Sequence, residues 1–152
     1  MLAPMVVTTL APMVWPQLDY DPARDFAPVA HVADFSIALA VNAAIPANTL
    51  AEFVAWTKVA PDRAYYGVSA VGGLPHLFGV VVARATATPW VAVPYRGLAP
   101  LSVDLAGGRI AAAMDALSNL IELHRGGKVR IVATSGSRRS SLVPEVPTFR
   151  EQ

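Results

Sequence analysis

The sequence predicts an α/β fold with a mostly parallel sheet and helices on both faces. Short apolar segments rich in β-branched residues alternate with segments that carry helix start and stop signals. This alternation is typical of parallel strands joined by helical crossovers. A chain of 152 residues is long enough for one domain with a sizeable core, and 54% hydrophobic residues is too many for a disordered chain.

Each expected helix has a local start or stop signal. Thr49 to Glu52 matches a capping box that opens a helix, which runs to about residue 60 because Pro61 stops it. Pro75 suits the first turn of a helix that runs to about residue 84. Two further helices are expected at 100–106 and 117–125, each followed by glycine.

The expected strands are the apolar runs between these helices. Residues 29–41 are apolar and β-branched with a polar interruption, which predicts one long strand or two short ones. The other strands are expected at 65–69, 90–94, 110–115 and 129–134. The two ends of the chain, 1–28 and 135–152, are rich in proline and turn signals, including a turn at Tyr20-Asp21-Pro22.

Composition argues against several classes of function. The formal net charge is +1 and the Lys and Arg residues are scattered, so no nucleic-acid partner is expected. The chain has no cysteine, and therefore no disulfide or thiolate metal site. His31, His76 and His124 do not show metal-ligand spacing, so no metal site is expected either.

Sequence motifs of common enzymes and of export are also missing. The chain contains neither G-x-S-x-G, nor G-x-x-x-x-G-K-[ST], nor G-x-G-x-x-G, so we expect a binding protein without a cofactor rather than a small α/β enzyme. No Lys or Arg precedes the apolar amino-terminal stretch, which predicts no secretory signal there. The least charged run, 35–51, is too short and too polar for a membrane span.

The clearest candidate binding region is the stretch 93–115. A strand leads into a loop with Tyr95, Arg96 and Gly97, and a later strand ends at Asp115. Ligands of α/β proteins bind at loops that follow the carboxyl ends of strands, so these residues are expected at one ligand-binding edge. Arg96 either pairs with a ligand carboxylate or is a solvated loop cation, and Asp115 either caps the next helix or faces the ligand.

A second candidate is the loop that connects the strand 65–69 to the next helix. Free N–H groups at a helix amino terminus, together with the helix dipole, favour an anion such as a carboxylate. His76 is interpreted either as a site residue or as a packed or capping histidine. Thr134, which ends the last strand, offers a hydroxyl donor. The candidates in this loop are Ser69, Val71, Gly72, Gly73 and His76.

Five segments carry a family resemblance. They are Y-D-P-A-R-D-F-A-P-V-A at 20–30, I-P-A-N-T-L-A-E-F at 45–53, H-L-F-G at 76–79, V-P-Y-R-G at 93–97 and V-P-E-V-P-T at 143–148. In this order they resemble the extracytoplasmic solute receptors of the tripartite tricarboxylate transporter family, often called Bug proteins. Members of that family are periplasmic two-lobed binding proteins that capture carboxylates and similar metabolites for a membrane transporter.

The resemblance implies a periplasmic-binding-protein-like fold of type 2, here essentially one lobe with remnants of the other. Residues 42–130 would form the second-lobe ligand-binding domain. Residues 1–41 would be a first-lobe remnant and hinge strand, and residues 131–152 the returning hinge strand and a further remnant. Thr8 and Thr9 resemble the hydroxyl-rich loop of the first lobe. The loop of Tyr95, Arg96 and Gly97 borders the cleft in this family.

The resemblance also implies partners and a compartment. The expected ligand is a small carboxylate, the expected protein partners are membrane permease subunits, and the expected location is periplasmic, or cytoplasmic if Met1 is the true start. This chain is much shorter than family members and is interpreted as truncated. Exposed first-lobe contacts would then permit a homodimer. The alternative function is therefore a self-associating fragment that binds no ligand.

Overall fold

The computed structural model describes residues 3–59 and 61–152. Residues 1 and 2, at the start of the stretch considered for a secretory signal, and residue 60, the expected end of a helix, lie outside the described residues. In chain order the elements are η1 (Val6–Leu10), α1 (Ala11–Val14), α2 (Pro22–Asp25), β1 (Ile37–Asn42), α3 (Leu50–Val59), η2 (Pro61–Arg63), β2 (Tyr65–Val68), α4 (Leu74–Ala85), β3 (Val91–Pro94), α5 (Leu98–Ala106), β4 (Ala112–Ala116), α6 (Leu117–Arg125), β5 (Val129–Thr134) and η3 (Phe149–Glu151).

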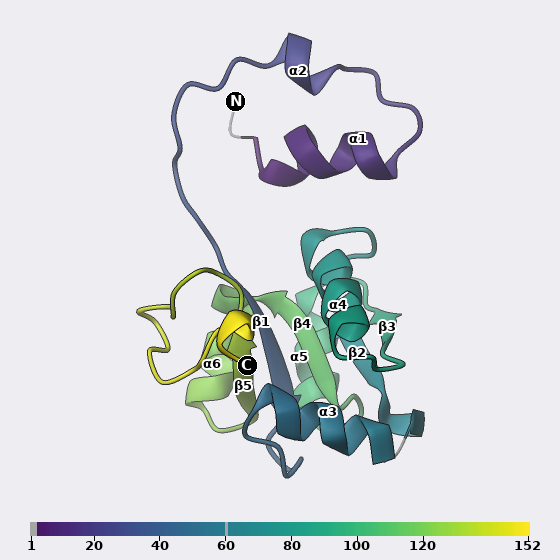
Figure 1. The fold of residues 1–152 in the computed structure, drawn as a ribbon, viewed down its shortest axis with the longest axis vertical. Helices are drawn as coiled ribbons and strands as arrows, with labels where there is room; N and C mark the ends of the chain where they lie inside the picture. Colours follow the sequence, from purple (N-terminus) through teal and green to yellow (C-terminus); the bar gives the residue numbers. More distant parts are fainter. Residues whose placement is uncertain (1–2, 60) are drawn as a thin grey trace.

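A five-stranded sheet with strand order β3-β2-β4-β1-β5 forms the body of the molecule (Figure 1). Strand β2 pairs in parallel with β3 and β4, whereas β1 pairs antiparallel with β4 and β5. Only β1 therefore opposes the common strand direction, which confirms the expected mostly parallel sheet. Helices α4, α5 and α6 provide the crossovers between strands that run in the same direction.

Helices cover both faces of this sheet. On one face, α3 and α4 pack against β1 through a cluster that includes Phe53 and Leu39. On the other face, α5 and α6 pack against the same strand through a cluster that includes Leu101 and Ala38. Successive strand residues point to opposite faces, so both sides of β1 are buried, and this explains why residues 37–41 are all apolar.

Helix ends largely follow the local signals. The Glu52 N–H donates to Thr49 Oγ1 over 3.1 Å, as a capping box requires, but the Glu52 carboxylate accepts from Asn48 N–H rather than from Thr49 N–H. Helix α5 begins at Leu98, before the expected start at Pro100, because Gly97 with φ 96° turns the chain directly into the helix. Pro100 still lies in the first turn, where its missing N–H costs little.

The N-terminal segment, residues 3–36, lies outside the sheet and contains η1, α1 and α2 (Figure 1). Asp21 accepts from Ala23 N–H over 3.0 Å and caps α2, at the position where the sequence indicates a turn. Residues 27–36 are extended and mostly exposed. The prediction of a strand from residue 29 is therefore wrong for its first part, because Val29 is 96% exposed and pairing begins only at Ile37.

The C-terminal segment, residues 140–152, packs closely against the sheet. Val143 and Val146 are buried in the same cluster as the apolar side chains of α5 and α6. Thr148 forms a parallel bridge with Thr134, whose N–H donates to the Pro147 carbonyl over 3.1 Å. The segment thus extends the sheet beyond β5 without forming a full strand.

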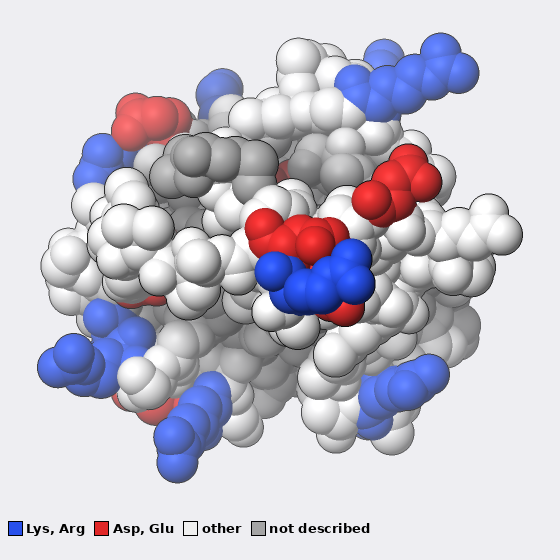
Figure 2. All heavy atoms as spheres, turned by 90° about the horizontal axis from the view of Figure 1, so that it is seen from above, with Lys and Arg blue, Asp and Glu red and all other residues white. Residues whose placement is uncertain are grey.

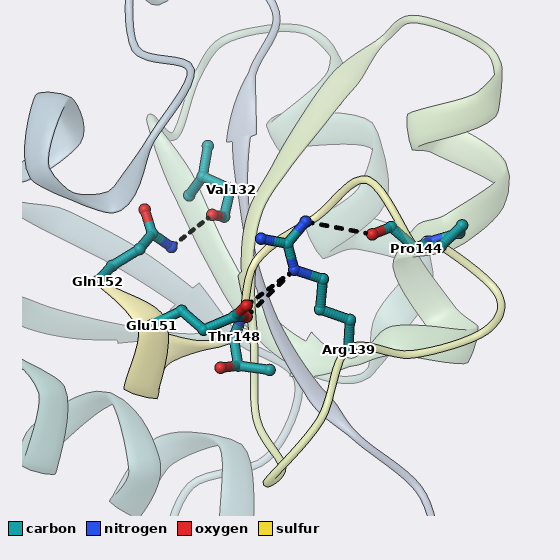
Figure 3. A network of polar contacts seen from close by, with 6 residues as sticks. All are labelled: Val132, Arg139, Pro144, Thr148, Glu151 and Gln152. Atoms are coloured by element: carbon teal, nitrogen blue, oxygen red, sulfur yellow. Dashed lines mark hydrogen bonds and ion pairs between the residues drawn. The ribbon is translucent and has the colours of Figure 1, made fainter.

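Polar side chains hold the end of the C-terminal segment (Figure 3). Arg139 Nε donates to both carboxylate oxygens of Glu151, over 3.0 and 3.2 Å. Gln152 donates through Nε2 to the Val132 carbonyl over 3.1 Å and accepts from Leu50 N–H over 2.9 Å. The last residue of the chain therefore connects strand β5 to the amino end of α3.

Charged side chains show no simple pattern on the face seen from above, over the N-terminal segment. Lys and Arg groups lie interspersed with Asp and Glu groups there, and neither sign forms a continuous patch (Figure 2). Among the helices of the described residues, none combines the length and apolar character needed to span a bilayer.

Candidate functional site

The loops after β2, β3 and β4 lie along one edge of the sheet because the three strands are parallel neighbours. Two of these loops are joined directly. The Tyr95 N–H donates to the Val68 carbonyl over 2.9 Å, and the Gly97 N–H donates to the Ser69 carbonyl over 3.3 Å. The structure therefore brings together the two loops that the sequence indicates as ligand-binding.

The β2–α4 loop is shaped by Gly72 and His76. Gly72 has φ 73°, a conformation that glycine adopts without strain, and its N–H donates to His76 Nδ1 over 3.1 Å. Gly73 is the residue before α4, and its carbonyl accepts from Leu77 N–H over 3.1 Å. In the first turn of an α-helix the N–H groups have no partner inside the helix, so Leu74 and His76 present amide donors at this edge.

The remaining residues of this loop differ in exposure. Val71 is exposed, whereas Ser69 is half-buried and supplies the carbonyl that receives the Gly97 N–H. Arg96, on the adjoining loop, is exposed and forms none of the ion pairs found within 3–59 and 61–152. The guanidinium of Arg96 is therefore accessible to a dissolved anion.

Tyr95 contributes its backbone to the edge, but its side chain points into the protein. The phenol donates to Asp104 Oδ2 over 3.1 Å, and Arg109 Nη1 donates to Asp104 Oδ1 over 3.1 Å. The ring also lies against Gly67, where an added Cβ would be 3.1 Å from Tyr95 Cε2. Burial, and then the hydrogen bond to Asp104, raises the pKa of the Tyr95 phenol. This hydroxyl is occupied within the fold and stays neutral at ordinary pH.

Asp115 and Thr134 both lie opposite Ala38, on the strands that flank β1. Asp115 is 2% exposed, and its Oδ1 accepts from Ala116 N–H over 2.7 Å and from Asn119 Nδ2 over 2.9 Å. Asp115 Oδ2 and Thr134 Oγ1 are buried and have no hydrogen-bond partner within the described part of the chain. In this conformation neither atom is open to a dissolved ligand.

Thr8 and Thr9 lie on η1, in the N-terminal segment, away from these loops in the sequence and on a separate element. Thr8 Oγ1 donates to the Met5 carbonyl over 3.3 Å. The N-terminal segment reaches the candidate edge at Val14, because a Cβ added to Gly72 would lie 3.9 Å from Val14 Cγ1. The structure therefore places Val14 of α1 beside the β2–α4 loop.

Two structural roles near the candidate residues were not predicted from the sequence. Asp104 holds the Tyr95 hydroxyl, and Ser135 Oγ accepts from Ile37 N–H over 2.8 Å at the entry to β1. Ser135 and Ile37 are 98 residues apart, so no local pattern could have paired them. The Tyr95–Asp104 spacing of nine residues spans a loop and a helix, which also leaves no periodic signal.

A cavity lies away from these loops. It has a volume of about 570 Å³ and is lined by residues at the opposite edge of the sheet, including Asn42, Trp56, Arg63 and Arg109. None of the candidate ligand residues lines it. The candidate loops therefore lie apart from this cavity.

The three histidines have separate surroundings. His31 contacts Asp34 over 3.0 Å, and His124 contacts Glu145 over 3.5 Å, while His76 is bonded to the Gly72 amide. Within the described residues, no group of three or more His, Asp or Glu side chains is arranged to hold a metal ion.

A mostly parallel sheet with helices on both faces and strand-end loops along one edge also occurs in solved proteins that resemble this chain. Rpa4515 from R. palustris, solved with adipate, has a TM-score of 0.85 and 31% identity, covering 97% of this chain and 49% of that one. MatC (Rpa3494) from Rhodopseudomonas palustris, solved with bound malate, has a TM-score of 0.79 and 27% identity, covering 93% and 48%. These likenesses confirm the periplasmic-binding-protein-like fold.

The family follows from sequence comparison. The model of the tripartite tricarboxylate transporter family receptor matches residues 1–152. Protein BugT from Bordetella pertussis is 31% identical over 136 residues, which cover 90% of this chain and 42% of BugT. The chain belongs to the tripartite tricarboxylate transporter receptor family, as the resemblance of its motifs predicted. It spans less than half the length of BugT and about half of the two solved proteins.

Proposed function

We propose that this chain is a solute-binding module that captures a small carboxylate for a transporter of the tripartite tricarboxylate type. The observation that carries the proposal is the hydrogen bond from Gly97 N–H to the Ser69 carbonyl, which joins the two candidate loops at one sheet edge in a member of a receptor family. Adipate in Rpa4515 and malate in MatC are both dicarboxylates, which supports this class of ligand.

The proposed mechanism is binding without catalysis. One ligand carboxylate accepts hydrogen bonds from the amide groups of Leu74 and His76, where the α4 dipole also favours a negative charge. Arg96, exposed on the neighbouring loop, pairs with the second carboxylate. A covering lobe then excludes water, and the strands that cross between lobes absorb the motion. No cofactor takes part in this mechanism.

The proposal includes a two-lobed organisation of the receptor. Residues 42–130 form the ligand-binding lobe, while 1–41 and 131–152 are hinge strands and contributions to the other lobe. Asp115, Thr134, Thr8 and Thr9 reach the ligand only if the closing of the lobes moves them. The receptor family supports permease subunits of the transporter as partners and a periplasmic location.

Isothermal titration calorimetry with adipate, malate and citrate tests this function, with 1,6-hexanediol as an uncharged control. We expect binding of at least one acid and none of the diol. Gly97→Ala should weaken binding about ten-fold or more, because φ 96° strains any other residue and displaces the loop. Gly127→Ala is the matched control: Gly127 also has positive φ, and neither glycine has an atom within 4 Å of an added Cβ.

Gly127 precedes β5, at the opposite edge of the sheet, so its substitution should leave the affinity unchanged. Equal losses in the two variants would mean that the effect comes from general destabilisation. A folded protein that shows no heat with any of the three acids would contradict the proposed function.

A second candidate function is supported by the N-terminal segment. Its exposed apolar side chains include Met13, Trp15, Val29, Val32 and Phe35. Such a surface favours self-association, so we propose as the alternative a homodimer or oligomer that binds no ligand. Size-exclusion chromatography with light scattering decides the matter. Self-association should disappear in Val32→Asp, and a monomer at high concentration would contradict this alternative.

A further inference from the structure

We propose that His76 is a positioning residue: its neutral imidazole holds the Gly72 turn in the shape that captures ligand, so that capture weakens as the pH falls. This inference rests on the proposed function. It concerns the residue that shapes the β2–α4 loop.

The direction of the hydrogen bond between Gly72 and His76 determines which tautomer the imidazole ring of His76 adopts. A backbone N–H can only donate, so the Gly72 N–H, 3.1 Å from His76 Nδ1, requires a lone pair on that nitrogen. The proton of the neutral ring must then be on Nε2. Protonation places a second donor on Nδ1, opposite the amide, and the hydrogen bond is lost.

The consequence is local because the bond closes a short loop. It connects Gly72, at φ 73°, to His76, the third residue of α4. Gly72 and His76 are both half-buried, so water replaces a lost hydrogen-bond partner poorly at this position. Losing the His76 acceptor therefore destabilises the conformation of the Gly72 amide. The loop then opens, and the amides of the first turn of α4 lose their arrangement toward the ligand.

His76 lies in the first turn of α4, next to Tyr66 of β2. Tyr66, on β2, donates its hydroxyl to the His76 carbonyl over 3.2 Å, and burial raises the pKa of that phenol, so Tyr66 supplies no negative charge. Within the described residues no ion pair joins His76 to a carboxylate, whereas His31 and His124 each have one.

Two variants separate positioning from packing. In His76→Asn the side-chain Oδ1 occupies about the place of Nδ1 and accepts from the Gly72 N–H, but it does not titrate. His76→Leu removes the acceptor and keeps an apolar side chain of similar size. His31→Asn is the control for a histidine that is exposed and far from the loop in the sequence.

The first measurement needs no ligand. ¹⁵N NMR of the full chain should show His76 as the Nε2–H tautomer at neutral pH. The Gly72 amide shift and its hydrogen-exchange protection should follow the titration of His76. A Gly72 amide that does not respond when the His76 ring titrates would overturn the inference.

The second measurement is adipate affinity by calorimetry between pH 7.5 and 5.5. In the wild type we expect a loss of about three- to ten-fold, the effect of one net hydrogen bond. His76→Asn should be flat once the protonation of adipate itself, identical for all variants, is subtracted. His76→Leu should bind weakly at every pH, and His31→Asn should match the wild type.

An affinity that rises on acidification would mean that the imidazolium contacts the ligand directly, and it would overturn the positioning role. A pH loss that persists in His76→Asn would do the same. If no carboxylate binds at any pH, the proposed function fails instead, and the Gly72 amide still decides whether His76 holds the turn.

Discussion

The N-terminal and C-terminal segments of this chain are both proline-rich and lie beside the sheet, yet they differ in how far their apolar side chains are buried. The N-terminal segment, residues 3–36, exposes Val29 at 96% of its surface, whereas Val143 in the C-terminal segment is 2% exposed. The same residue type is fully solvated at one end of the chain and part of the core at the other. Apolar composition alone therefore does not say which segment contributes to stability.

The difference lies in the partners that each segment finds. The C-terminal segment adds two valines to the core and bonds to β5 and α3 through Gln152. The N-terminal segment bonds mainly within itself, for example from the Tyr20 hydroxyl to the Val7 carbonyl over 3.0 Å. We infer that the C-terminal segment folds with the sheet, while the N-terminal segment can open without it.

The largest expected contrast is in proteolysis. Phe35 is 58% exposed in an unpaired stretch, whereas Phe149 packs edge-to-face on Phe78 with ring centroids 5.1 Å apart. Chymotrypsin should therefore cut after Phe35 at least about a hundred-fold faster than after Phe149, because the latter site requires local unfolding. Mass spectrometry of the fragments over time measures both rates. Similar cleavage rates after Phe35 and Phe149 would show that the two segments do not differ in local stability.

Aspartate substitutions in the two segments should change the free energy of unfolding by different amounts. Val143→Asp places an unpaired carboxylate in the core and should lower the free energy of unfolding by about 3 kcal/mol or more. Val29→Asp makes the same chemical change at an exposed position and should stay within about 0.5 kcal/mol. Urea denaturation followed by circular dichroism gives both values. A large loss in Val29→Asp would show that the N-terminal segment has a partner after all.

Gln152 tests the attachment of the chain end. Gln152→Ala removes the acceptor of the Leu50 N–H and the donor to the Val132 carbonyl, which should cost about 1 kcal/mol. Arg150→Ala, an exposed neighbour, is the control and should change the free energy of unfolding by less than about 0.5 kcal/mol. Thermal unfolding of the two variants side by side is sufficient, and equal midpoints would argue against a role for Gln152.

The smallest effect is expected from Glu151. The Thr148 N–H, and then the Arg139 guanidinium, holds the pKa of the Glu151 carboxyl below its usual value. Because the folded state lowers this pKa, the contribution to stability is present above the unfolded pKa and is lost as the pH falls through the folded one. Glu151→Gln should therefore flatten part of the acid side of the stability profile. Parallel profiles for the variant and the wild type would be the contrary result.

Much of the fold could be predicted locally. The signals around Leu117, Gly126 and Val129 placed α6 and β5 within the bounds that the structure shows, because glycine stops and apolar periodicity act over a few residues. The strand expected at 29–41 was half right. Val29 and Val32 have β-branched side chains suited to a strand, but a strand also needs a neighbour, and pairing begins only at Ile37.

The candidate site was predictable as an edge but not as a set of side chains. Ser69 and Gly97 come together because both follow parallel neighbouring strands, a consequence that the sequence pattern contains. Whether each candidate side chain contacts a ligand stays a prediction. The direction of the Tyr95 phenol, toward Asp104 and away from the edge, depends on how α5 packs, which no local motif encodes.

By itself, the sequence determined the family, the alternation of strands and helices, and the edge where their loops meet, because motifs, periodicity and turn residues are local properties. Only the tertiary structure decided that β1 runs against its neighbours, that Gln152 ties β5 to α3, and that residues 27–36 stay unpaired. The physical reason is the same in each case. The free energy of these arrangements comes from contacts between residues distant in sequence, and no window of neighbouring residues contains both partners.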